Sequence, residues 1–115
     1  TLAAIPATLT KLSKLDKNLL IVSFSNLRLI ITNSTSIPKN TVQNFNQILK
    51  NGSLSTYYGL TEASRSTFMI FEKNKGREES VGKIAPDVTI KIENKEQSDQ
   101  KIGEIWIKGN NVIKK

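Results

Sequence analysis

The sequence predicts an α/β fold in which buried parallel strands, linked by a helix, are followed by antiparallel strands. Residues 27–31 form a short and almost wholly apolar run, which is typical of a buried parallel strand. Residues 37–50 place apolar side chains at the i, i+3, i+6 and i+7 spacing of one helix face. Residues 88–93 and 104–108 alternate apolar and polar side chains, which indicates half-buried antiparallel strands.

The N-terminal residues are expected to be extended and then helical. Pro6 fits the first turn of a helix, where its missing N–H costs nothing, so we predict a helix from Pro6 to about Leu15. Residues 16–26 are interpreted as a linker with an apolar centre. The strand at 27–31 then ends in small polar residues at 32–36, and open α/β sheets bind ligands beyond the carboxyl ends of their strands.

The helix predicted over residues 37–50 begins near Pro38 and ends at Asn51-Gly52. A β-prone run, Ser53 to Tyr58, follows and enters a turn at Gly59, where the absent side chain allows a positive φ or the close approach of a ligand. Strand, loop, helix and strand together predict a βαβ-like unit with a right-handed crossover.

The second half of the chain is predicted to be mainly β-structure. Residues 66–71 are expected to form a strand and residues 72–79 an exposed, charged connection. Residues 94–101 are expected to form the hairpin loop between the two alternating strands. Trp106 is interpreted as a core or sheet-edge residue rather than as a platform for a ligand.

Composition limits the function further. The 115 residues form at most one domain, with 17 Lys and Arg against 10 Asp and Glu and a net charge of +7. The basic residues are scattered and lack aromatic residues between them, which argues against a nucleic-acid partner, although a polyphosphate ligand gains from a positive field. The apolar runs are too short to span a membrane.

The chain contains neither Cys nor His, which excludes disulfides, thiolate or imidazole metal ligands and a histidine base. Any chemistry must therefore use Glu, Asp, Lys, Ser, Thr, Tyr or the backbone. The absence of Cys also fits a reducing compartment, and we expect a cytoplasmic location.

Four residues close together suggest a loop that binds a nucleotide and a metal. Tyr58 offers a flat ring, Gly59 a flexible joint, Thr61 a hydroxyl and Glu62 a carboxylate. Magnesium is usually held by one or two carboxylates together with substrate phosphates, so a single Glu beside a hydroxyl is a sensible partial site. The alternative is a strand end with a core tyrosine, an N-capping threonine and a solvated glutamate.

Residues 58–62, Tyr-Gly-Leu-Thr-Glu, resemble the Tyr-Gly-x-Thr-Glu signature of the adenylate-forming (AMP-binding) superfamily, which includes acyl-CoA synthetases, peptide-synthetase adenylation domains and luciferases. Three further segments resemble that family in the same order: Leu29 to Pro38 the adenine-flanking strand and loop, Ser80 to Ala85 the Gly-Arg/Lys-Pro segment, and Gly103 to Lys114 the Gly-Glu-Ile-x-x-x-Gly-x-Asn-Val-x-Lys signature. Together these matches span nearly the whole chain.

The resemblance implies that the chain is an internal fragment of the large N-terminal domain of an acyl-CoA synthetase-like enzyme. Residues 1–78 would be its α/β part and residues 79–115 the start of a small β-barrel subdomain. Such an enzyme joins a carboxylic acid to the α-phosphate of ATP with Mg²⁺, expels pyrophosphate, and passes the acyl group to coenzyme A or a carrier-protein pantetheine. Its partners would be the rest of its own domain and a C-terminal domain with a catalytic lysine, so the fragment is expected to be inactive alone.

The resemblance also implies roles for individual residues. Tyr58 would stack near the adenine with Asn33 and Ser34 on its other side, Thr61 would contact phosphate, and Glu62 would ligate Mg²⁺. The predicted catalytic residues are Thr61 and Glu62, and the predicted nucleotide-binding residues are Asn33, Ser34, Thr35, Tyr57, Tyr58, Gly59, Leu60 and Thr61.

Two short segments depart from the usual family pattern or admit a second interpretation. The family usually has Gly-Gly or Gly-Ser at Asn33 and Ser34, where Asn still tolerates left-handed φ and the cluster can equally cap the next helix. Ala63, Ser64 and Arg65 would face the carboxylate substrate, although we interpret Arg65 as a surface or ion-pair residue.

The acyl substrate and the thiol acceptor are left open by the sequence. Leu60 is more typical of acyl-CoA synthetases than of peptide-synthetase domains, which usually have Pro at that position. The competing hypothesis is a non-catalytic α/β binding or interaction module in which residues 58–62 form only a turn.

Overall fold

The computed structural model describes residues 1–33, 35–93 and 102–113. Its elements follow in the order β1 (Leu2–Ala3), α1 (Pro6–Leu12), α2 (Lys17–Ser23), β2 (Leu29–Thr32), α3 (Lys39–Ile48), β3 (Ser53–Tyr58), β4 (Thr67–Ile70), the 3-10 helix η1 (Phe71–Lys73), β5 (Lys83–Ile84), β6 (Val88–Glu93) and β7 (Glu104–Gly109).

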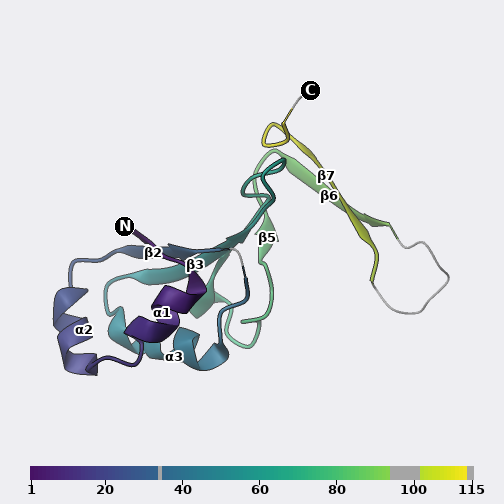
Figure 1. Cartoon of the computed structure of the whole chain (residues 1–115). Helices are drawn as coiled ribbons and strands as arrows, with labels where there is room; N and C mark the ends of the chain where they lie inside the picture. The colour runs from purple at the N-terminus through teal and green to yellow at the C-terminus, as the bar shows by residue number, and fades with distance from the viewer. Residues whose placement is uncertain (34, 94–101, 114–115) are drawn as a thin grey trace.

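A five-stranded mixed sheet carries the site, in the strand order β1-β2-β3-β4-β5. Strands β1, β2 and β3 are parallel, whereas β4 and β5 are antiparallel to their neighbours. Strands β6 and β7 form a separate antiparallel hairpin. Figure 1 shows the three helices on one side of the sheet and the hairpin projecting away from it. The predicted fold class, parallel strands followed by antiparallel strands, is confirmed.

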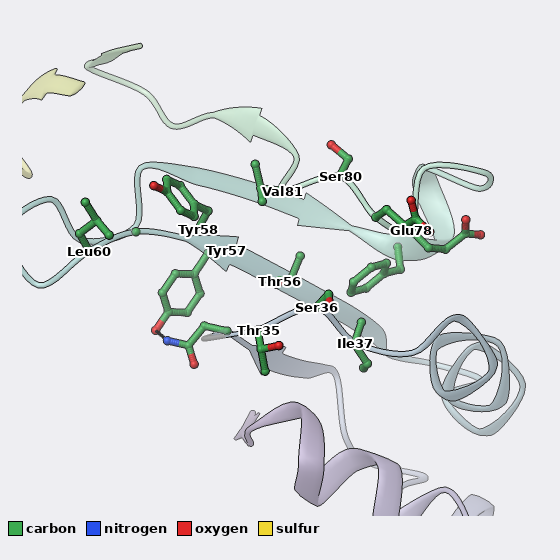
Figure 2. Close-up of a pocket in the computed structure, with 14 residues that line it drawn as sticks. Thr35, Ser36, Ile37, Thr56, Tyr57, Tyr58, Leu60, Glu78, Ser80 and Val81 are labelled. Carbon is green, nitrogen blue, oxygen red and sulfur yellow. Dashed lines mark hydrogen bonds between the residues drawn. The ribbon is translucent and has the colours of Figure 1, made fainter. Parts of the chain in front are cut away.

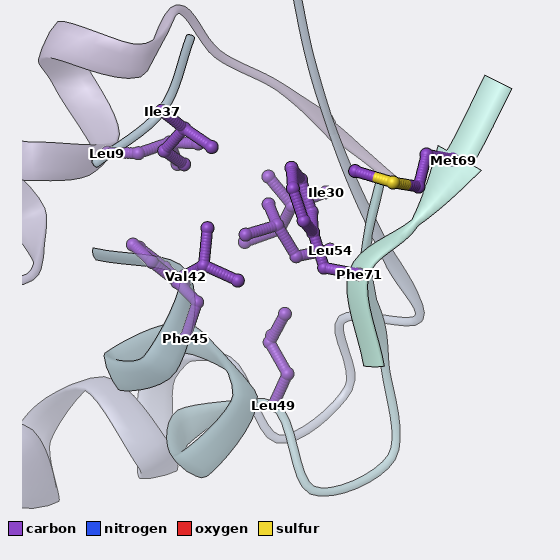
Figure 3. Packing of buried hydrophobic residues seen from close by; sticks show 9 residues of the cluster. All are labelled: Leu9, Ile30, Ile37, Val42, Phe45, Leu49, Leu54, Met69 and Phe71. Atoms are coloured by element: carbon purple, nitrogen blue, oxygen red, sulfur yellow. The ribbon is translucent and has the colours of Figure 1, made fainter. Parts of the chain in front are cut away.

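The core lies between the sheet and helix α3. Ile30 of β2 is the register partner of Leu54 of β3, and both side chains are fully buried beneath the helix. Phe45 of α3 is also fully buried and stacks on Phe24 with ring centroids 6.4 Å apart. Figure 3 shows this cluster, whose buried members are Leu9, Ile30, Ile37, Val42, Phe45, Leu49, Leu54, Met69 and Phe71. The apolar face predicted for α3 is therefore the core face.

Helix α2 corrects the interpretation of residues 16–26 as a linker. The Asp16 side chain accepts a hydrogen bond from the Leu19 N–H at 2.8 Å and so caps the helix. Helix α1 ends at Leu12 rather than near Leu15, because the chain leaves the helix in tighter i→i+3 turns, including Leu15 N–H to the Leu12 carbonyl. The predicted bounds of β3 agree with the structure.

The hairpin has the predicted antiparallel pairing but not the predicted burial. Trp106 is 55% exposed, and Ile92 and Ile105 are also exposed. Neither face of the hairpin is covered by another layer within the described residues, so the alternation of the sequence has no core on which to pack (Figure 1). The predicted hairpin loop, residues 94–101, lies outside the described residues.

The helices are short. In the part of the chain that the structure describes, none combines the length and the apolar content needed to cross a bilayer.

Replacing Phe45 by Ala is expected to lower the free energy of unfolding by about 3–5 kcal/mol, because it empties a fully buried site and leaves a cavity. Urea unfolding followed by circular dichroism measures the change. Val22→Ala on helix α2 is the control, because Val22 is 72% exposed and its loss should change stability by less than about 0.5 kcal/mol. Equal effects of the two substitutions would contradict the packing described.

Candidate functional site

A cavity of about 410 Å³ lies at the carboxyl ends of strands β2 and β3. One wall is the loop after β2, another is the end of β3 with the turn that follows, and residues 78–81 close the opposite side (Figure 2). The lining residues are Asn33, Thr35, Ser36, Ile37, Thr56, Tyr57, Tyr58, Gly59, Leu60, Phe71, Glu78, Glu79, Ser80 and Val81. Parallel neighbours bring these strand ends together, as expected for an open α/β sheet.

The two tyrosines at the end of β3 serve different sides of the strand. Figure 2 shows the Tyr57 and Tyr58 rings pointing in opposite directions, which follows from the alternation of side chains along a strand. Asn33 donates a hydrogen bond from Nδ2 to the Tyr57 hydroxyl at 2.7 Å. This bond ties the loop after β2 to β3 and fixes the Tyr57 ring.

The turn after Tyr58 is held by its own backbone. Leu60 N–H donates to the Ala63 carbonyl at 3.1 Å, and Ala63 N–H donates to the Leu60 carbonyl at 3.3 Å. A Cβ on Gly59 would collide with the backbone nitrogen of Arg65 and lie 2.9 Å from the Ala63 carbonyl oxygen. Glycine is therefore required by the close approach of the chain to itself, whereas a positive φ, one of the two predicted reasons, does not occur at Gly59.

The structure brings together six of the predicted site residues around the cavity: Asn33, Thr35, Tyr57, Tyr58, Gly59 and Leu60. Thr61 and Glu62 are exposed and do not line it, because the tight turn directs them toward solvent. Ser34 lies outside the described residues. The roles predicted for these residues stay predictions.

The segment at the C-terminal end of the described chain returns to this turn. Asn111 donates from Nδ2 to the Ser64 carbonyl at 3.0 Å and to Ser66 Oγ at 2.9 Å. Ser66 is fully buried and donates in turn to the Ala63 carbonyl at 2.9 Å. Ile113 N–H donates to the Glu62 carbonyl at 2.8 Å. The backbone from Glu62 to Ser64 is thus fixed from a distant part of the sequence.

Sequence reasoning missed this contact because its two sides are 45 residues apart. Asn111 lies in the segment 103–114 that resembles a family signature, which marked the residue but not its partner. The role of residues 78–81 as a cavity wall was also missed, because the charged residues 72–79 were predicted to form an exposed connection.

Arg65 adopts a left-handed backbone conformation, with φ at 55°. Its guanidinium carbon lies 5.6 Å from the centroid of the Tyr57 ring, within the range of a cation–π contact. The expected surface position of Arg65 is confirmed. No ion pair joins Arg65 to another described residue, so the expected ion-pair role is replaced by the aromatic contact.

Two carboxylates give one wall of the cavity a negative charge. Glu78 and Glu79 both line it. The backbone N–H groups of Glu78 itself and of Gly76 lower the pKa of the Glu78 carboxyl below its usual value, with Gly76 N–H donating to Oε1 at 3.1 Å. The described residues contain no cluster of three or more acidic, His or Cys side chains that could hold a metal ion unaided.

A comparison with known protein families assigns this chain to one of them. The family model described as "AMP-binding enzyme" matches residues 1–115, the full length of the chain. The chain belongs to the AMP-binding enzyme family. It is also 27% identical over 93 residues to acyl-CoA synthetase 7 of Caenorhabditis elegans, a match that covers 78% of the chain and 17% of that protein. The resemblance identified in the sequence is confirmed.

Several solved structures share the fold. CmiS6 superimposes with a TM-score of 0.79 at 14% identity over 96% of this chain. VinN in complex with L-aspartate gives 0.75 at 23% identity over 97% of the chain, and MenE of Bacillus subtilis, an o-succinylbenzoate coenzyme A synthetase solved with ATP and magnesium, gives 0.74 at 24% over 98%. This AMP-binding segment spans 28%, 28% and 23% of those three chains, respectively.

Replacing Asn111 by Ala is expected to lower the free energy of unfolding by about 1–3 kcal/mol, because two hydrogen bonds to the turn are lost. Hydrogen exchange at the Ile113 amide, which bonds to the Glu62 carbonyl, should accelerate in the same variant.

Asn110→Ala is the matched control, because Asn110 is the exposed neighbour of Asn111. Asn111→Asp tests the donor specifically, since it keeps the shape of the side chain but points an acceptor at the Ser64 carbonyl. An Asn111→Asp variant as stable as the original chain would show that the Nδ2 bonds do not hold the turn.

Proposed function

We propose that this AMP-binding segment belongs to an ATP-dependent carboxylate-activating ligase of the acyl-CoA synthetase type. One observation carries the proposal. The cavity is lined jointly by the loop after β2 and by the end of β3, the two segments that resemble the family's adenine-flanking loop and Tyr-Gly-x-Thr-Glu signature. They are more than 20 residues apart in the sequence, as the 24-residue separation of the Asn33–Tyr57 hydrogen bond shows.

The cavity suits the base of a nucleotide. Its volume of about 410 Å³ falls within the roughly 300–1,000 Å³ typical of small-molecule sites. The ring of Tyr58 offers a stacking face, and Asn33, Ser34 and Thr35 are proposed to line the opposite side of the adenine.

The charges of the cavity walls orient the nucleotide in this proposal. Glu78 and Glu79 repel phosphates, so the phosphates should extend away from them, toward the turn. Figure 2 shows Leu60 and Glu78 at opposite ends of the cavity. Thr61, which follows Leu60, is proposed to donate a hydrogen bond to a phosphate oxygen.

The exposed carboxylate of Glu62 is proposed to ligate Mg²⁺. A single carboxylate is a sufficient protein contribution when nucleotide phosphates supply further ligands, and this fits the absence of a larger acidic cluster among the described residues. A bound Mg²⁺ would neutralise phosphate charge while the acyl-adenylate forms and pyrophosphate leaves. The MenE structure solved with ATP and magnesium supports this choice of ligands.

The substrate is proposed to be a small-molecule carboxylic acid, and the acceptor coenzyme A or a carrier-protein pantetheine. L-aspartate, which is bound to VinN, and the o-succinylbenzoate named for MenE both carry carboxylates. The match to acyl-CoA synthetase 7 favours a thioester product. We also propose a cytoplasmic location, which the lack of Cys favours.

In this proposal residues 1–78 and 79–115 belong to neighbouring parts of a larger adenylation domain. The remainder of that domain would supply the phosphate loop and the ribose contact, and a C-terminal domain would supply a catalytic lysine. The 17% coverage of acyl-CoA synthetase 7 supports the need for such partners.

Replacing Glu62 by Gln in the complete protein that carries this segment is expected to lower Mg²⁺-dependent pyrophosphate exchange on the order of 100-fold or more, because the metal loses its charged ligand. Folding should be unchanged, since the Glu62 side chain is exposed. Glu93→Gln on the hairpin is the control. An unaffected exchange rate would remove Glu62 from the site.

The purified 115-residue chain is expected to catalyse no pyrophosphate exchange into ATP with any carboxylic acid, because the groups proposed to hold the triphosphate and the catalytic lysine lie elsewhere. A carboxylate panel scored by radiolabel exchange measures this. Exchange above the level of a heat-denatured sample would contradict the proposal that catalysis needs groups outside these 115 residues.

A further inference from the structure

Arg65 is held in place unusually firmly for an exposed side chain. Its φ of 55° lies in the left-handed region, which costs free energy for a residue with a side chain. The surroundings impose this conformation, because Gly59 packs against the Arg65 backbone and the next residue, Ser66, is buried and bonded to Asn111. The backbone therefore fixes the direction in which the Arg65 side chain leaves the turn.

The guanidinium lies on a ring that is itself fixed. The centroid of the Tyr57 ring lies 5.6 Å from the guanidinium carbon of Arg65 and 6.0 Å from the centroid of the Phe68 ring. The Tyr57 hydroxyl accepts the hydrogen bond from Asn33. No carboxylate among the described residues pairs with Arg65. Its planar donors are thus oriented, and they remain available to an anion.

The same sheet face carries a second cation and no acid. Tyr57, Phe68 and Lys83 are successive register partners across β3, β4 and β5, so their side chains share one face. The other residues of β3 and β4 on that face are Ser53, Ser55 and Ile70. On this face, the three strands therefore offer an anion beside Tyr57 a positive charge and no negative one.

This face is the side of β3 opposite Tyr58 (Figure 2). Tyr57 borders the cavity as well, so an acid that reacts at the phosphate end, while Tyr58 faces the adenine as the proposed function requires, lies beside the Tyr57 ring on which Arg65 stacks. Both sides meet at the Gly59–Glu62 turn, where the phosphates are proposed to lie.

We propose that Arg65, oriented by Tyr57, binds a second acidic group of the substrate, so that the enzyme prefers dicarboxylic over monocarboxylic acids. This inference rests on the proposed function. A carboxylate accepts two parallel hydrogen bonds from one guanidinium, and such charge-assisted pairs are among the stronger polar contacts in proteins.

The test uses the complete protein that carries this segment and compares acids of matched length: succinate with butyrate, and adipate with hexanoate. For the original enzyme, kcat/KM measured by pyrophosphate release should be at least about tenfold higher for the better diacid than for its matched monoacid. Arg65→Gln should remove this preference mainly through a higher KM for the diacid, while the monoacid rates stay within about threefold.

Arg65→Lys keeps the charge but loses the bidentate fork, so an intermediate preference is expected. Arg28→Gln is the control, because Arg28 is an exposed arginine just before β2, at the opposite end of the sheet from the site. Its preference should equal that of the original enzyme.

Three outcomes would overturn the inference. Pyrophosphate release with monoacids but without a preference for diacids would reject the Arg65 site and leave the proposed function intact. An equal loss of both rates in Arg65→Gln would assign Arg65 to the stability of the turn. If none of the carboxylic acids supported pyrophosphate release, the proposed function would be rejected, and the inference with it.

Discussion

The contact between the Asn111 segment and the turn after Tyr58 organises the rest of this molecule. Asn111, Ser66 and Ile113 supply hydrogen bonds that hold the backbone carbonyls of Glu62, Ala63 and Ser64. Each such bond contributes only about 1 kcal/mol net, but together they replace the freedom of an exposed loop by one conformation. They also connect the segment after the hairpin to the turn after β3, and so link two sheets that are otherwise hydrogen-bonded separately.

The end of strand β3 gains two distinct surroundings from simple alternation. Tyr58 lines the cavity between the loop after β2 and residues 78–81. Tyr57, which also lines the cavity, points the other way and contacts Asn33, Arg65 and Phe68. A strand that ends in two consecutive aromatic residues can therefore present a different chemical environment on each side while its backbone stays in one ladder.

Much of the fold followed from local patterns, and the failures have physical causes. Strand β3 was predictable because β-prone residues lie between Gly52 and Gly59. The side of α3 that packs on the core was predictable from the spacing of its apolar residues. Helix α2 was missed because it depends on one capping contact by Asp16. The nearness of Asn33 to the end of β3 was predictable, since adjacent parallel strands end at the same edge. The contacts of Asn111 and the orientation of Arg65 were not, because they depend on tertiary packing and on backbone strain that no local pattern encodes.

The β6–β7 hairpin presents apolar side chains to water on a projecting two-stranded ribbon, with Trp106 among them. A two-stranded ribbon without a supporting layer is only marginally stable. The net charge of +7 makes copies of the chain repel one another, which opposes the association of such ribbons. Dissolved salt screens this repulsion and weakens it. The colloidal behaviour of this segment is therefore governed by ionic strength, with dilute, low-salt buffers keeping its ribbons apart.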